Sequence, residues 1–200
     1  MHRLNMLSFL ILLLGLLNCA PAEAGKVPFN DGWLFSLKAD STAVNLGYDD
    51  KDWQTVTLPH DWSIRQEFDQ RAPAGNDGGY LPAGCGWYRK TLNITPDDLD
   101  KEHGLYFEGV YMNSEVYVNG HLAGGHPYGY SSFYVDITPY LHPGNNVIAV
   151  KADNSLQKNC RWYSGSGIYR NVHLVKKNKI NVPLYGIKVV TPDLHTAIVT

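Results

Sequence analysis

The chain has 200 residues, of which 44% are hydrophobic, 12% aromatic and 18% charged. This composition is typical of a folded globular protein and excludes a disordered or collagen-like chain. The formal net charge is −2, so the sequence lacks the basic surplus of nucleic-acid-binding proteins, and we expect no nucleic-acid partner. The 19 glycines, 11 prolines and 13 tyrosines favour a turn-rich β protein over a helical bundle.

Residues 1–24 have the features of an export signal. A short basic start precedes an apolar run over residues 7–17, which is too short to span a bilayer as a helix. Two processing routes stay open: cleavage after Ala22-Glu23-Ala24, or lipidation of Cys19 in the lipobox-like segment Leu16-Leu17-Asn18-Cys19. Both predict an exported protein without a membrane span, either a periplasmic or outer-membrane lipoprotein or a secreted protein.

Two cysteines remain once the signal is set aside. Cys85 and Cys160 lie in a chain expected in an oxidising compartment, where a disulfide persists. A disulfide between them and two free buried thiols are equally compatible with the sequence.

Strand patterns recur along the mature chain, each bounded by turn residues. They cover residues 86–92, 105–110, 116–118, 121–123, 133–137, 146–151, 168–175 and 187–190. Asn119-Gly120 is the strongest short-range signal for a hairpin. The best helix candidate, residues 96–102, amounts to one or two polar turns. Short strands and long loops therefore predict an all-β antiparallel sandwich or jelly roll.

Two long loops, residues 63–84 and 153–167, carry the side chains that suit carbohydrate recognition. Aromatic rings stack on the apolar faces of sugars, and charged or amide groups bind their hydroxyls. The loops supply both kinds of group: Asn76, Asp77, Tyr80, Arg161, Trp162 and Tyr163. The alternative interpretation is that Trp162 and Tyr163 pack in the core while Arg161 is a solvated loop charge.

Other chemistries find little support in the residue spacing. No pair among the glutamates of the mature chain has a spacing that marks it as catalytic, and Glu108 is expected to pair with a basic residue such as Arg89. The histidines show no zinc-ligand spacing, and there is no phosphate-binding loop. We therefore expect neither a metal nor another cofactor.

A series of ordered segments is more specific than any single motif. In chain order they are Phe29-Asn30-Asp31-Gly32-Trp33, Pro59-His60-Asp61-Trp62, Gly86-Trp87-Tyr88-Arg89-Lys90, Phe107-Glu108-Gly109-Val110, Val116-Tyr117-Val118-Asn119-Gly120, Asn145-Asn146-Val147-Ile148-Ala149-Val150 and Arg161-Trp162-Tyr163-Ser164-Gly165-Ser166-Gly167-Ile168-Tyr169-Arg170. The series, over roughly residues 26–176, resembles the N-terminal sugar-binding domain of glycoside hydrolase family 2, which includes β-galactosidases, β-glucuronidases and β-mannosidases. Two of these segments, Pro59-His60-Asp61-Trp62 and the last one, which begins at Arg161, look most like the exported bacterial β-galactosidase branch.

This resemblance implies the domain organisation. Residues 25–177 would form a jelly-roll sandwich of the galactose-binding-domain type, and residues 178–200 would begin an immunoglobulin-like domain. In the family both catalytic glutamates lie on a later (β/α)8 barrel, so we expect a partial chain that is inactive alone. The barrel and a β-galactoside-type glycan are its implied partners.

The resemblance also implies the site. Loops of this domain reach the barrel and help to shape the pocket for the terminal sugar, with Asp77 as a hydroxyl acceptor and Arg161 as a hydroxyl donor. His60 and Asp61 would cap a turn or lie close to the barrel interface. A standalone carbohydrate-binding module, a purely structural role, and a parent β-glucuronidase or β-mannosidase stay open as alternatives.

Overall fold

The computed structural model describes residues 25–156, 158 and 162–200. The export signal, the lipidation of Cys19 and the placement of Arg161 fall outside these ranges and stay predictions. Cys160 also lies outside them, so its pairing with the half-buried Cys85 stays open. Within the described ranges, no helix is long and apolar enough to cross a bilayer.

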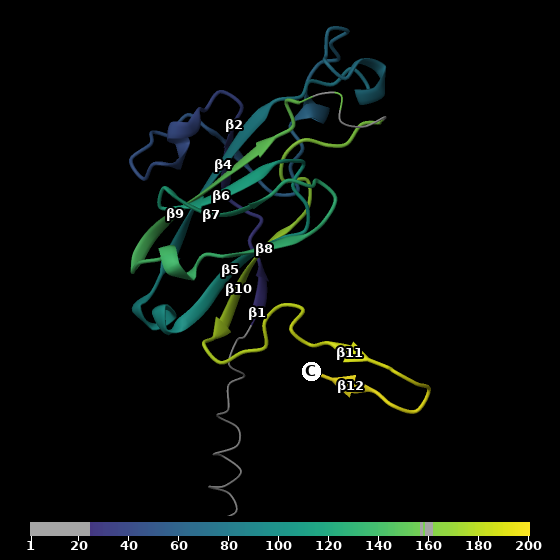
Figure 1. Ribbon diagram of the computed structural model, residues 1–200. Helices are drawn as coiled ribbons and strands as arrows, with labels where there is room; N and C mark the ends of the chain where they lie inside the picture. The colour runs from purple at the N-terminus through teal and green to yellow at the C-terminus, as the bar shows by residue number, and fades with distance from the viewer. Residues whose placement is uncertain (1–24, 157, 159–161) are drawn as a thin grey trace, which may run out of the picture.

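Two antiparallel sheets form the body of the molecule (Figure 1), which confirms the predicted all-β sandwich. The smaller sheet has the order β1 (Gly25–Pro28), β10 (Val172–Asn178), β5 (Lys101–Phe107), β8 (Phe133–Asp136). The larger has the order β3 (Gln54–Val56), β2 (Trp33–Ser36), β4 (Cys85–Ile94), β9 (Gly144–Asp153), β6 (Ser114–Val118), β7 (His121–His126).

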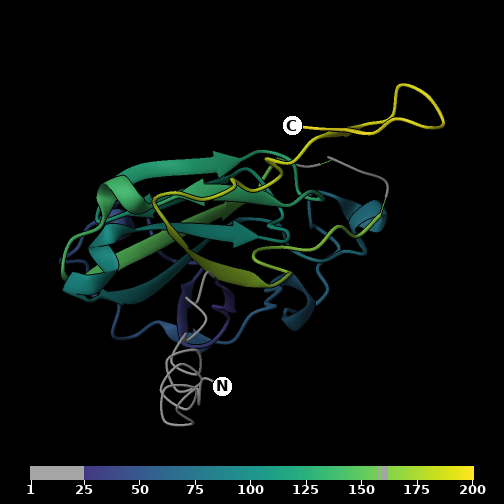
Figure 2. The ribbon, with the colours of Figure 1, turned by 90° about the horizontal axis from the view of Figure 1, so that it is seen from below.

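Short 3-10 turns and one separate hairpin complete the described structure. The turns are η1 (Ser41–Val44), η2 (Ser63–Arg65), η3 (Gly75–Gly78), η4 (Pro96–Asp100) and η5 (Thr138–Tyr140). The hairpin of β11 (Val189–Val190) and β12 (Ile198–Val199) projects away from the sandwich in both views (Figures 1 and 2). It lies within the segment predicted to begin a second domain.

The core fills the space between the two sheets. Alternate residues of a strand point to opposite faces, so each sheet presents one apolar row to the other. Tyr88 and Val150 of the larger sheet, which are paired across β4 and β9, and Leu105 and Phe107 of β5 are fully buried. Each such side chain contributes roughly 1.5–3 kcal/mol by leaving water, so this double row is the main source of stability.

The charged side chains of Arg89 and Glu108 have partners that the residue spacing in the sequence does not identify. The expected pairing of Glu108 with a basic residue is confirmed, since Lys26 Nζ lies 3.9 Å from its carboxylate, but Arg89 is not that residue. Arg89 Nε donates to Asp50 at 2.7 Å, whereas Glu108 contacts His173 Nε2 at 2.9 Å and accepts a hydrogen bond from Asn171 Nδ2 at 3.0 Å. Arg89 lies on β4 of one sheet and Glu108 directly follows β5 of the other, so the core separates them.

At one end of the core, Gly167 packs so closely against Tyr88 that a side chain at residue 167 would clash with it. A methyl group at residue 167 would lie 2.2 Å from the Tyr88 hydroxyl oxygen and 2.8 Å from the Trp62 ring. Gly167 also has a φ of +99°, which side chains rarely adopt. This glycine therefore allows the loop 153–167 to return closely onto the core.

His60 lies beside the same tyrosine and is buried. Its Nδ1 is 2.9 Å from the Tyr88 hydroxyl. Burial, with a smaller contribution from the charge of Arg65, lowers the pKa of His60 to about 4. The imidazole is therefore neutral at pH 7 and acts as a structural hydrogen-bonding group.

Substitution of Gly167 by Ala should destabilise the fold far more than a matched glycine does. Gly144 is the control because it has a similar φ of +89° and nothing within 4 Å of the added methyl. We expect Gly144→Ala to cost about 1 kcal/mol from backbone strain, and Gly167→Ala to cost at least ~2 kcal/mol more from overpacking. Urea unfolding of both variants measures the difference, and equal losses would contradict the close packing.

Burial of His60 should make stability fall as the pH decreases from 7 to 5. The unfolded chain takes up a proton at His60 near pH 6.5 and the folded protein only near pH 4, so protonation favours unfolding within this window. The expected loss from His60 is about 2 kcal/mol between pH 7 and pH 5. The pKa of the buried His103 is also lowered by burial, which adds a loss of the same sign.

Denaturant titrations at pH 7 and pH 5 test whether the loss of stability comes from the burial of His60. His60→Gln should reduce the pH dependence, whereas His121→Gln, which removes an exposed histidine, should preserve it. An unchanged pH dependence in His60→Gln would be incompatible with a buried neutral His60.

Candidate functional site

The loops 63–84 and 153–167 lie together at one end of the sandwich, at the upper right of Figure 1. Three buried polar side chains, Ser63, Asn154 and Ser166, join them. The Ser63 and Ser166 hydroxyls are 2.5 Å apart, and Asn154 Nδ2 donates to Ser166 Oγ at 2.7 Å. Asn154 Oδ1 accepts the amide of Gly84 at 2.8 Å, so one side chain bonds both loops.

Asp61 orients the aromatic part of the second loop. One of its carboxylate oxygens accepts the amide of Ser63 at 3.0 Å, which forms a local Asx-type turn where the chain enters η2. The other oxygen accepts a hydrogen bond from the Tyr163 hydroxyl. Burial and this carboxylate raise the pKa of Tyr163, so the hydroxyl remains a proton donor over the physiological range.

Asp77 lies in η3 and reaches the second loop through an ion pair. Lys158 Nζ is 3.1 Å from Asp77 Oδ2, with the side chains 56% and 35% exposed, respectively. Asp77 is thus accessible to a hydroxyl, which fits the expected acceptor role, but its role as a sugar ligand stays a prediction. Arg161, its expected partner in the site, lies outside the described residues.

Trp162 and Tyr163 are on the surface of this end, with exposed fractions of 63% and 37%. The alternative that both pack in the core is therefore wrong. The bond from Tyr163 to Asp61 holds the segment in place while the Trp162 ring faces outward. A held, exposed indole is an effective surface for stacking.

The two loops also expose further large apolar side chains. Among the described loop residues the exposed ones are Ile64, Phe68, Tyr80 and Leu156. Of these four residues, only Tyr80 was predicted from the sequence to contact a sugar. Large apolar residues within otherwise polar loops are a signal that could have indicated the other three, because proteins rarely gather such residues on a free surface.

The space enclosed between the loops is small. The cleft bordered by Ala74, Pro82, Tyr111, Trp162 and Tyr163 has a volume of about 20 Å³, enough for about one water molecule. A pyranose ring does not fit inside it. The residues that border this small cleft can therefore contact a sugar only from outside it.

Glu108 and Glu115 are unsuited to act as the general acid of glycoside cleavage. A general acid in this reaction needs a raised pKa. The pKa of Glu108 is lowered, mainly by its bond to His173, and the pKa of Glu115 is lowered by bonds from Tyr117 and Lys151 that outweigh the effect of burial. Both carboxylates are ionised partners in structural bonds.

The described part of the chain contains no group of three or more His, Cys, Asp or Glu side chains placed to hold a metal ion. What this end of the molecule offers is an exposed aromatic segment, a carboxylate and several apolar side chains on a rigid support.

Comparisons with known proteins agree with this architecture. Residues 28–178 match the family model described as "Glycosyl hydrolases family 2, sugar binding domain". The beta-galactosidase BoGH2A of Bacteroides ovatus is 50% identical over 167 residues, which are 83% of this chain and 20% of that protein. A putative beta-glucuronidase of Formosa agariphila is 40% identical over 186 residues, 93% of this chain and 18% of that protein.

Solved structures give the same result. A beta-glycosidase from Bacteroides vulgatus superposes with a TM-score of 0.79 at 45% identity, over 83% of this chain and 22% of that one. The chain thus spans about a fifth of the length of the relatives that it matches. The matched residues include both sheets and both end loops, and the chain belongs to the family of glycoside hydrolase family 2 sugar-binding domains.

Proposed function

We propose that this domain supplies one side of the terminal-sugar subsite of a family 2 glycosidase whose reactive carboxylates lie on a separate catalytic domain. The observation that carries the proposal is the exposed segment Trp162-Tyr163, held by Asp61 beside the Asp77–Lys158 pair. The indole face suits a sugar ring and the carboxylate suits a hydroxyl. The cleft of about 20 Å³ is consistent with a site that another surface completes.

A β-galactoside-type glycan is our proposed substrate, with a β-glucuronide as the alternative. The 50% identity to a beta-galactosidase favours the first, and the 40% identity to a putative beta-glucuronidase keeps the second. The proposed role for Arg161, as a hydroxyl donor next to Trp162 in the sequence, applies to either sugar. The export signal predicted in residues 1–24 would place the protein outside the cytoplasm.

Residues 178–200 are proposed to begin an immunoglobulin-like domain. Strands β11 and β12 are two residues long, and their valines and Ile198 are exposed. Ile180 and Leu194 are almost fully exposed. An isolated short hairpin is marginally stable in water, so these apolar side chains favour packing against further polypeptide.

Asp77→Asn in a polypeptide that also carries the catalytic domain tests the sugar contact. The substitution keeps the shape but removes a charged acceptor, so kcat/KM should fall at least about tenfold, equivalent to roughly 1.4 kcal/mol of transition-state stabilisation. The Asp77–Lys158 pair is exposed and stabilises the fold by at most about 1 kcal/mol, so the melting temperature should change little.

Asp69→Asn is the matched control, because Asp69 lies in the same loop and forms an exposed ion pair with Arg71 at 3.0 Å. Its kcat/KM should equal that of the parent. Equal kcat/KM values for both variants would argue against a sugar contact at Asp77. A loss of stability or assembly without a kinetic effect would instead support a structural role for this end of the domain.

The chain alone should not hydrolyse nitrophenyl β-galactoside, because neither Glu108 nor Glu115 has the raised pKa of a general acid. Turnover above that of a mock preparation would refute this expectation. Calorimetry with galactosides and glucuronides should detect no micromolar binding at the end loops. Such binding, if lost in Trp162→Ala, would favour the standalone carbohydrate-binding module.

A further inference from the structure

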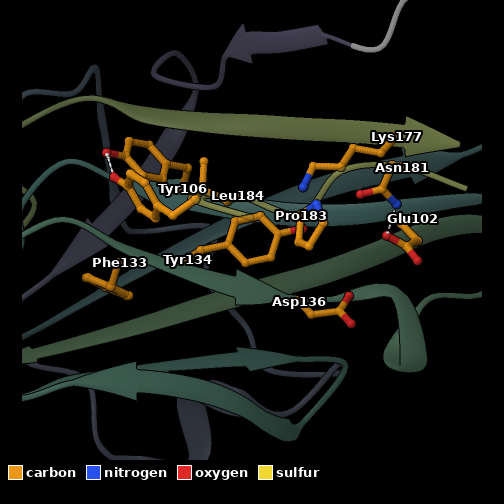
Figure 3. A pocket seen from close by; sticks show the side chains of 10 residues that line it. Glu102, Tyr106, Phe133, Tyr134, Asp136, Lys177, Asn181, Pro183 and Leu184 are labelled. Carbon is orange, nitrogen blue, oxygen red and sulfur yellow. Dashed lines mark hydrogen bonds between the residues drawn. The ribbon is translucent and has the colours of Figure 1, made fainter. Parts of the chain in front are cut away.

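A second cleft, of about 350 Å³, lies on the outer face of the smaller sheet (Figure 3). Strands β5, β8 and β10 form its floor, and residues 181–185, which follow β10, form its wall. None of its lining residues belongs to the loops 63–84 or 153–167. Its volume lies within the range of about 300–1,000 Å³ that is typical of small-molecule sites.

The floor of this cleft contains an aromatic ring that lies flat on the sheet. Tyr134 of β8 pairs with Tyr106 of β5. Gly104, two residues before Tyr106 on β5, pairs with Asp136 and has no side chain. A methyl group at residue 104 would lie 2.1 Å from the Tyr134 ring, so the ring occupies the space above the glycine. The hydroxyl end of the ring thus lies against the backbone of Gly104, and the ring borders the cleft together with Lys177, whose ammonium lies over it.

Polar side chains gather at one end of the cleft, as Figure 3 shows. Asn181 Nδ2 donates to Glu102 Oε2 at 2.7 Å, and Asp136 Oδ1 accepts the amide of Thr138 at 2.9 Å. A carboxylate accepts up to about four hydrogen bonds, so both retain capacity. The ammonium of Lys177 lies 5.3 Å from the centre of the Tyr134 ring and adds a donor.

Aromatic residues form the other end. The hydroxyls of Tyr106 and Tyr185 are 3.4 Å apart, which links the wall to the floor on that side. The Asn181–Glu102 bond links them at the polar end. The cleft is therefore held at both ends by contacts between the wall and β5.

We propose that this cleft binds a neutral pyranose unit of a glycan, with the Tyr134 ring under the sugar and the polar end on its hydroxyls. A pyranose has an apolar face and a hydroxyl-bearing edge, which match the two halves of the lining. Two carboxylates, Glu102 and Asp136, oppose the single ammonium of Lys177, so an acidic sugar would be repelled. The site is distinct from the end loops and would hold a glycan without cleaving it.

Titration of the isotopically labelled chain with methyl β-D-galactopyranoside, followed by amide chemical shifts, tests the proposal. We expect shifts at Gly104, Tyr134 and Lys177 with a millimolar dissociation constant. Methyl β-D-glucuronide should bind at least several-fold more weakly because of its carboxylate. Tyr134→Phe should retain binding, whereas Tyr134→Ala should weaken it at least about tenfold, since it removes the stacking surface.

Tyr128→Ala is the matched control, because Tyr128 is exposed and does not line the cleft; it should bind like the parent. If Tyr134→Ala does not fold, Lys177→Met provides a second test and should weaken binding. No shifts at tens of millimolar sugar, shifts confined to the end loops, or undiminished binding by the folded variants would overturn the proposal. Shifts at the end loops alone would still be compatible with the role proposed for Asp77 and Trp162.

Discussion

The hydrogen bonds among Ser63, Asn154 and Ser166 hold together two loops that meet only in the folded chain. All three side chains are buried, so each polar atom left without a partner would cost about 1–3 kcal/mol. Breaking one bond therefore weakens the others, and the loops are fixed as a unit. The exposed residues Trp162 and Tyr163 are placed on a rigid support, which a binding surface needs for defined contacts.

The two surfaces considered for sugar binding differ in how completely they enclose a ligand. The cleft between the two end loops has about 20 Å³, and an open hollow on loop 63–84, lined by Phe68, Gln70 and Tyr80, has about 570 Å³. The cleft over β5 and β8 has about 350 Å³ and is bordered by both a floor and a wall. A surface that touches a sugar on one side adds specificity to a site completed by another domain. A cleft with a floor and a wall contacts the sugar on two sides and can hold it alone, though weakly. The same domain can in this way orient the reacting sugar and retain the glycan chain nearby.

The sequence patterns predicted the long central strands well, since β4 and β9 have strong alternation and buried apolar rows. They did not predict β1, β2 and β3, which have three or four residues each and show too few alternations to stand out. The 3-10 turn η4 occupies the predicted helical segment, because the capping bonds between Thr95 and Asp98 close one turn before β5 begins.

The spacing of residues along the sequence could not predict contacts between distant segments. The bond from Tyr163 to Asp61 and the seat of Tyr134 on Gly104 depend on strand order and register. The mistaken pairing of Glu108 with Arg89 has the same origin. Arg89 lies on β4 and Glu108 directly follows β5. The local sequence predicts both strands but does not indicate which sheet each strand joins.

The high content of glycine and tyrosine has a cause beyond the number of turns. Added methyl groups at Gly104, Gly129 and Gly167 would lie 2.1–2.2 Å from Tyr134, Tyr111 and Tyr88, respectively. In each case the missing side chain provides the space for a tyrosine ring or hydroxyl. Tyr88 closes the core beneath the end loops, Tyr111 borders the cleft between them, and Tyr134 is the floor of the second cleft. Both proposed sugar-contacting surfaces thus depend on glycines that seat an aromatic residue, and the composition that predicted a turn-rich fold also reflects this packing.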